Sequence, residues 1–439
     1  MRTSALVLAL VSSLSWACSL ERFDALAEAA PVTSVALDFP ARPEAELAIA
    51  LTVAADDEGR GRVLFGDGPS AIGWYRLEER GGGELLFASE QALAQLATHE
   101  HPTLTGLAVV EPGTKAVAEA LVRVAGDEGA PERIVRFRVA DFSRPSAPEL
   151  DMLVYPWVAD PAPALVGPLA AVQLDEGLPE ALSGSDAGLI IWDALGSRVA
   201  AYAAAREQLL ADDPSVFEAD PRHGWGLTRC PELAPRAIAG GRLLADRRRA
   251  AVVLEGEILT LVGPEQPAES SLIGAPIYSC ELATIELPSP AASLLVVDLE
   301  RDGNDDLLVG APAVGEVWIY ENQGDGLPAG PTRVLAGDEP GGFGATLAHV
   351  ELGGEAPEVI LVGAPETTIG GEPEVGRVHV FRAADGELLR TLEDLEPQAG
   401  SRHGLGVHGL DLPGREELVI TGARELRVHW TIFTDDPRP

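Results

Sequence analysis

Basic residues are scarce in this chain, and their scarcity limits the classes of partner. Lys and Arg together number 32 against 69 Asp and Glu in 439 residues, giving a formal net charge of -37 at pH 7. A surface with this excess of carboxylate repels a phosphate backbone, so the composition argues against nucleic acid as a partner. Aromatic residues are also few, at 5%, yet 46% of the residues are apolar, which is ample for a packed core.

Long apolar runs are rare, and the longest stands at the start of the chain. Arg2 is followed by an apolar run at residues 5–14 and then by Ser15-Trp16-Ala17-Cys18. The run is about half the ~20 residues that a membrane-spanning helix needs, so it predicts a cleaved secretory signal rather than a span. We expect a signal peptide at residues 1–17, a short tether at 18–30 and export of the mature chain.

Cys18 leaves two outcomes open for the exported protein. The segment resembles the lipobox of bacterial lipoproteins, in which the Cys after the cleavage site is acylated, although Ser15 and Trp16 depart from that pattern. That resemblance implies an anchor in the outer membrane or periplasm. The alternative is ordinary cleavage after Ala17, because Ser15 and Ala17 fit the small-x-small rule, and then the protein would be secreted.

Cysteine is otherwise limited to Cys230 and Cys280. In an oxidising compartment an even pair predicts a disulfide, and closing a 50-residue loop would stabilise the fold by about 4 kcal/mol. Two buried thiols are the alternative. Neither Cys has a His or a second Cys at zinc-ligand spacing.

Turn-forming residues are abundant, and short apolar motifs recur at a nearly constant interval. Gly numbers 47 and Pro 34. Leu307-Leu308-Val309-Gly310-Ala311-Pro312 returns as Ile360-Leu361-Val362-Gly363-Ala364-Pro365 and, more weakly, at residues 418–423. A second short strand with a large apolar end can be picked out in seven places, averaging about 61 residues apart. The end residues are Phe65, Phe137, Trp192, Leu261, Tyr320, Phe381 and Trp430.

A unit of about 60 residues with several short strands is typical of a propeller blade. A TIM barrel would need a long amphipathic helix after nearly every strand, and the sequence lacks these. The repeat therefore predicts an all-β, seven-bladed β-propeller over residues 31–435.

The last units resemble the FG-GAP repeats of the integrin alpha-subunit propeller and its bacterial relatives. Phe343-Gly344 stands twenty residues before Gly363-Ala364-Pro365, and His403-Gly404 before Gly422-Ala423 is a weaker copy. Trp225-Gly226 offers a third. The resemblance is clearest over residues 291–430, thin over 160–290 and almost lost before that. It implies a seven-bladed propeller that serves for binding and scaffolding.

One loop carries recognisable metal chemistry. Residues 298–306 resemble the calcium loop D-x-D-x-D-G-x-x-D, with carboxylates at positions 1, 3, 5 and 9 and Gly303 at position 6 for a sharp turn. Calcium prefers six to eight hard oxygen ligands, and so many anions are costly unless a cation neutralises them. We expect one calcium site with a structural role, because residues 351–359 and 411–417 have lost the pattern. Its ligands would be Asp298, Glu300, Asp302, Asp306 and the backbone carbonyl of Asn304.

The expected function is a non-catalytic extracytoplasmic module that binds a protein or a surface glycan through loops on one face, as a monomer. The sequence has no G-x-S-x-G, HExxH or P-loop motif. The alternative is a catalytic propeller, a glycosidase or lyase with convergent carboxylates around the central channel.

Overall fold

The computed structural model describes the chain in segments. In the first part these are residues 33–37, 47–53, 62–67, 71–77, 83–89, 103–110, 119–125, 133–141 and 149–155. In the second part they are 164–174, 180–194, 217–220, 225–264, 278–337, 341–350, 358–393, 398–412, 415–422 and 426–430. The predicted signal peptide at residues 1–17, Cys18 and the tether at 18–30 lie outside these segments. Among the described residues, no helix is long and apolar enough to cross a membrane.

The described strands form antiparallel sheets, and regular helix is almost absent from the described segments. Two sheets follow in chain order: β2 (Leu47–Val53), β3 (Arg62–Asp67), β4 (Ala71–Leu77), β5 (Gly83–Ser89), then β6 (Thr103–Val110), β7 (Glu119–Ala125), β8 (Arg133–Asp141), β9 (Glu149–Tyr155). A five-stranded sheet has the order β10 (Leu165–Val172), β11 (Glu180–Ser185), β12 (Gly188–Ala194), β14 (Trp225–Cys230), β13 (Phe217–Asp220).

A 3-10 turn, η2, lies at Ala245–Arg247. Three further four-stranded sheets repeat the same up-and-down order. Their strands are β15 (Ala237–Gly241), β16 (Ala250–Glu255), β17 (Ile258–Pro264), β18 (Tyr278–Glu286); β19 (Ser293–Val297), β20 (Asp306–Ala311), β21 (Glu316–Tyr320), β22 (Arg333–Ala336); and β23 (Thr346–Val350), β24 (Val359–Ala364), β25 (Arg377–Arg382), β26 (Leu388–Glu393).

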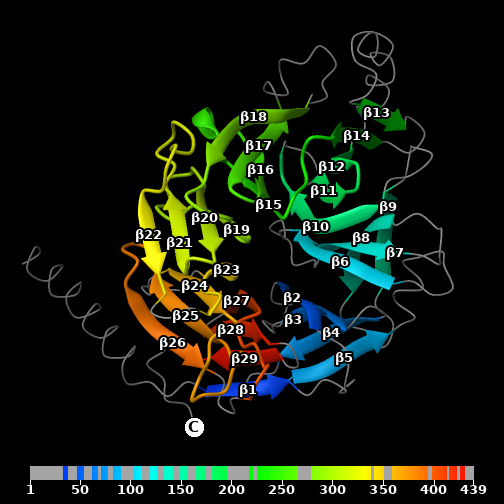
Figure 1. The fold of residues 1–439 in the computed structure, drawn as a ribbon. Coiled ribbons are helices and arrows are strands. Elements are labelled where there is room, and N and C mark those ends of the chain that lie inside the picture. Colours follow the sequence, from blue (N-terminus) through cyan, green and yellow to red (C-terminus); the bar gives the residue numbers. More distant parts are fainter. Residues whose placement is uncertain are drawn as a thin grey trace, which may run out of the picture.

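The last sheet joins the two ends of the chain. Its order is β27 (Gly406–Leu412), β28 (Arg415–Thr421), β29 (Leu426–Trp430) and then β1 (Thr33–Leu37), so the first strand pairs antiparallel with the last, with Val35 opposite Val428. In Figure 1 the blue β1 and the red β29 lie side by side. The first and the last described strands are therefore joined by a ladder of backbone hydrogen bonds.

The sheets are arranged around a common axis in a propeller-like ring (Figure 1). The first strand of each sheet contacts the first strand of the next, in the order β2, β6, β10, β15, β19, β23 and β27, and β27 contacts β2 again. In the described clusters the core lies between neighbouring sheets, because second strands such as β20 and β24 are buried along their whole length. One such cluster joins Leu308 and Ile319 of one sheet to Ile360 and Phe381 of the next.

The repeated motifs occupy equivalent strands, with two exceptions. The Leu-Leu-Val-Gly-Ala and Ile-Leu-Val-Gly-Ala motifs form β20 and β24, the second strands of their sheets. Six of the seven predicted large end residues lie on third strands, but Phe65 lies on β3, a second strand. The third strand there is β4, with Trp74 and Tyr75. Trp225-Gly226, expected to be an FG turn, lies within β14.

The FG and GAP motifs meet at the boundary between sheets. The Gly344 amide donates to the Gly363 carbonyl of its own sheet at 3.1 Å, while the Gly344 carbonyl accepts from the Ser293 hydroxyl of the preceding sheet at 2.7 Å. A Cβ on Gly310 would lie 2.0 Å from that same carbonyl. Glycine is therefore required where the turn of one sheet presses on the strand of its neighbour.

The predicted disulfide is present and also joins neighbouring sheets. Cys230 ends β14 and Cys280 lies in β18, with their Cα atoms 5.4 Å apart. Cys230 is fully buried in the cluster between these two sheets. The bond thus reinforces a boundary that is also held by apolar packing and by a hydrogen bond from the Tyr278 hydroxyl to Glu180.

Candidate metal site

The predicted calcium loop connects the first two strands of one sheet. Asp298 follows the last residue of β19, and Asp306 is the first residue of β20. Val297 pairs directly with Asp306, so the eight residues between them, 298–305, form a closed loop at one rim of the ring. We call residues 298–305 the acidic loop.

The acidic loop is turned by hydrogen bonds from its own backbone. The carboxylate of Asp298 accepts from the amides of Asp302 at 3.0 Å and Gly303 at 2.8 Å. Arg301 and Gly303 both have positive φ, at 56° and 89°, so the sharp turn predicted at Gly303 is present. Asp302 accepts from the backbone and side chain of Asn304, and these hydrogen bonds hold the pKa of Asp302 below its usual value.

Asp306 is the most deeply placed carboxylate of the predicted ligand set. It is fully buried, and its two oxygens accept from the amides of Leu299 at 2.9 Å and Asn322 at 2.8 Å. Burial raises the pKa of Asp306 to about 7, with a further upward contribution from Glu300 beside it. The ionised form is thus destabilised, which a cation near both carboxylates would reverse.

Asn304 supplies a second sign of an unmet partner. The residue is 6% exposed, and its Nδ2 donates to both carboxylate oxygens of Asp302 at 3.0 Å. Its Oδ1 is buried and accepts no hydrogen bond. A buried oxygen without a hydrogen-bond donor destabilises the folded state, and coordination of this oxygen to a cation would offset that cost.

The donor set fits calcium in chemistry, but its side chains are not gathered on one point. Among the described residues, no three Asp, Glu, His or Cys side chains form a group that could hold a metal ion. Asp298, Asp302 and Asp306 direct oxygens at backbone amides instead. To bind calcium, these carboxylates would have to turn from the backbone amides toward a common point. The exposed side chain of Glu300 would have to approach the same point.

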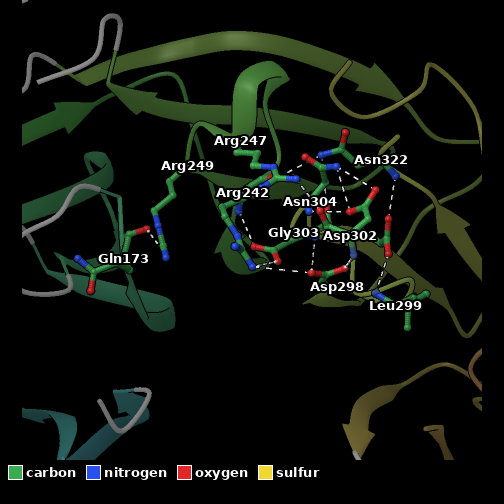
Figure 2. A network of polar contacts seen from close by, with 12 residues as sticks. Gln173, Arg242, Arg247, Arg249, Asp298, Leu299, Asp302, Gly303, Asn304 and Asn322 are labelled. Carbon is green, nitrogen blue, oxygen red and sulfur yellow. Dashed lines mark hydrogen bonds and ion pairs between the residues drawn. The ribbon is translucent and has the colours of Figure 1, made fainter. Parts of the chain in front are cut away.

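Two arginines that the motif did not predict lie against the acidic loop. Arg242 follows β15 of the preceding sheet, and its Nη2 lies 3.2 Å from Asp305 Oδ1 and 3.9 Å from Asp298 Oδ2. Arg247 Nη2 donates to the carbonyl of Asp302 at 2.7 Å. Figure 2 shows both side chains reaching across from one loop to the other. The contact with Asp305 raises the pKa of Arg242.

Arg249, close to Arg247 in the same loop, contacts the sheet on the opposite side, which contains β10. Arg249 Nη1 donates to the Gln173 carbonyl after β10 at 3.3 Å, as drawn in Figure 2. On the far side of the acidic loop, Arg301 pairs with Glu358, which precedes β24. Loops of four consecutive sheets are thus linked along one rim. The run Arg247-Arg248-Arg249 was the sequence signal for this link, but sequence alone does not tell which acids an arginine run will meet.

The chain was compared with known proteins. No family model matches it. Among curated proteins, it is 33% identical to integrin alpha-5 of Xenopus laevis over 151 residues, or 31% of the chain. The chain is similar to integrin alpha subunits. Integrin alpha-3 of Cricetulus griseus is 30% identical over 135 residues and that of Mus musculus 28% over 138. The match spans only 14%, 11% and 12% of these three relatives.

Two solved structures give the same picture of weak overall likeness. BBS1N in complex with ARL6DN has a TM-score of 0.49 at 14% identity, covering 93% of this chain and 99% of that one. Sqt1 of Chaetomium thermophilum bound to the N-terminus of ribosomal protein L10 has a TM-score of 0.46 at 16% identity, covering 84% of this chain and 80% of that one.

Proposed function

We propose that residues 31–435 form one seven-bladed FG-GAP propeller that acts as a non-catalytic binding or scaffold module. The closed ring of first strands and the pairing of β1 with β29 support a single propeller in which each sheet is a blade. The observation that carries the functional part is the similarity to integrin alpha subunits. The loops at one rim of the ring then offer the binding surface, for a protein or a surface glycan.

A binding experiment tests this role. In one arm, the immobilised mature chain is incubated with envelope extract and bound proteins are cross-linked to it. In the other arm, the chain is applied to an array of surface glycans. Both arms are run with calcium and with EGTA. We expect saturable retention of one protein or one glycan class and no change in the glycans themselves. Cleavage of an arrayed glycan, or no saturable retention on either arm, would contradict the proposal.

We propose that the acidic loop and Asp306 hold one calcium ion with a structural role. The buried, unpaired oxygen of Asn304 and the raised pKa of Asp306 support a cation there. A ligand that binds only the folded state stabilises it by about 2.7 kcal/mol at a hundredfold excess over its Kd. Calcium would thus tie β19 to β20 at the rim of their blade.

Melting curves with calcium and with EGTA test the ion directly. Calcium is expected to raise the midpoint of the wild type and to leave Asp302→Ala unchanged. Glu257→Ala is the matched control, because it removes one exposed carboxylate from the hairpin turn between β16 and β17. An equal response of wild type and Asp302→Ala to calcium would assign the ion elsewhere.

We also propose that the chain is exported and held to a membrane through acylated Cys18. The support is the sequence pattern of residues 2–18. Metabolic labelling with an alkyne fatty acid should mark the wild type and not Cys18→Ala, and the variant should leave the membrane fraction. Unlabelled, freely released wild type would instead indicate plain cleavage after Ala17.

A further inference from the structure

The acidic loop has an equivalent in the preceding sheet with the opposite charge. Gly241 pairs with Ala250 as Val297 pairs with Asp306, so residues 242–249 occupy the same eight positions between the first two strands. Both second positions hold a buried leucine, Leu243 and Leu299. We call residues 242–249 the arginine loop.

The charges of the two loops match in size and oppose in sign. The arginine loop has four arginines and one Asp, for a formal charge of +3, and the acidic loop has four acids and one Arg, for -3. Arg242 stands at the position equivalent to Asp298, the first expected calcium ligand, and Ala250 at that of Asp306. A loop with arginine at the first position and alanine at the last lacks the oxygens to hold calcium itself.

Hydrogen bonds join the backbone of the arginine loop to the acidic loop at Arg242. The Arg242 amide donates to Asp305 Oδ2 at 2.6 Å, and the Asp305 amide donates to the Arg242 carbonyl at 3.2 Å. Asn322 Nδ2 also donates to the Arg242 carbonyl, at 3.1 Å, while the Asn322 amide donates to Asp306. One network thus positions both the arginine and the buried carboxylate.

Arg247 is placed in the same way. Asp246 and Arg247 adopt positive φ, at 59° and 60°, which is strained for residues with a Cβ. The turn brings the Arg247 guanidinium over Gly303, where a Cβ would lie 3.0 Å from its Cζ. The strained turn therefore aims a second cation at the acidic loop.

We infer that the arginine loop is a built-in counter-ion of the acidic loop, and that Arg242 competes with calcium for Asp298 and so sets the calcium affinity. This rests on the proposed calcium site. It assigns Asp298 a cation partner in the absence of calcium, because a guanidinium group lies 3.9 Å from this carboxylate. It also predicts that the fold survives without calcium.

The test compares single variants of the arginine loop by calorimetric calcium titration and by melting in EGTA. Arg242→Gln removes the charge at Asp298, and a unit charge about 4 Å away is worth about 1 kcal/mol even at the dielectric constant of water. We therefore expect roughly fivefold tighter calcium binding, a lower midpoint in EGTA and a larger rise on adding calcium. Arg242→Lys keeps the charge and should behave as the wild type.

Arg248→Gln is the matched control, because it removes one charge from the same loop at a residue whose backbone hydrogen bonds lie within its own turn. If wild type and Arg242→Gln bind calcium equally, the competition is refuted while the calcium site stands. If only Arg242→Gln binds, the competition is supported and the native calcium role falls. If neither binds, both fall.

Poor folding of Arg242→Gln would also be decisive. If its circular dichroism spectrum is not native in EGTA, recovery on adding calcium supports the replacement of one cation by the other. A spectrum that stays non-native with calcium, while Arg248→Gln folds normally, would overturn the inference and assign Arg242 a purely architectural role.

Discussion

At the scale of single residues, the contacts between neighbouring sheets depend on glycine and on small hydroxyl side chains. Gly310 is pressed by the carbonyl of Gly344, and Gly363 is pressed by that of Gly404. In each case a hydroxyl of the first strand, Ser293 or Thr346, donates to the same carbonyl, at 2.7 and 2.8 Å. The equivalence explains why both residue types recur in the sequence.

Gly310→Ala should destabilise the protein by about 1–3 kcal/mol, because its Cβ would overlap the Gly344 carbonyl. Gly330→Ala is the control, since a Cβ there meets nothing within 4 Å. Chemical denaturation measures both. Equal stabilities would show that the turn of the next sheet can move away freely.

The titration of Asp306 should appear in the pH dependence of stability. Its folded pKa of about 7 lies above the ~3.9 of an unfolded Asp, so the folded chain binds the proton more tightly and stability falls as pH rises from about 4 to 7. In EGTA, we expect the wild type to lose up to about 1.4 kcal/mol per pH unit more than Asp306→Asn over that range. Parallel profiles would mean that Asp306 stays ionised throughout.

At the scale of elements, adjoining sheets are fastened by different means at different boundaries. The boundary between β14 and β18 has a disulfide, while that between the β19 and β23 sheets has the Gly344 turn. At the boundary between the β15 and β19 sheets, an ion pair between Arg242 and Asp305 joins the loops that follow these two strands. Each of these contacts links segments that are distant in sequence. Each therefore restricts the conformational freedom that the chain would gain if the two sheets separated.

Removing the disulfide should lower stability by an amount set mainly by the unfolded chain. For a loop of 50 residues the chain-entropy model gives about 4 kcal/mol, so Cys230→Ala/Cys280→Ala should unfold at clearly lower denaturant. The wild type in reductant should behave like the double variant. A double variant as stable as the oxidised wild type would show that the reduced chain retains structure across this boundary.

At the scale of the whole molecule, the pairing of β1 with β29 closes the ring. Without β1, β29 would become an edge strand with unpaired backbone groups, and the last sheet would be one strand short. Closure depends on five residue pairs, from Thr33 with Trp430 to Leu37 with Leu426. The stability of the ring is therefore set jointly by residues at opposite ends of the chain.

Two truncations isolate this closure. Removing residues 1–30 leaves β1 intact and should not change the melting midpoint, whereas removing residues 1–38 deletes β1. We expect the longer deletion to lose a large part of the roughly 5–15 kcal/mol typical of folded domains and to aggregate. Equal midpoints for the two truncated chains would show that β1 does not contribute to stability.

The sequence alone determined that the repeated apolar segments form buried β-strands, which cysteines pair in the disulfide, and that the chain turns at Gly303. These follow from local patterns: the apolar run of β20, an even cysteine count and a fixed spacing of acids around one glycine. The tertiary structure decided that β4, and not the strand of Phe65, is the third strand of the sheet formed by β2 to β5. It also decided which groups contact the acidic loop. Arg242 lies 56 positions before Asp298 in the chain, and only the packing of one sheet against the next brings their side chains together. A contact of that kind depends on the rotation between sheets, which no pattern within either loop encodes.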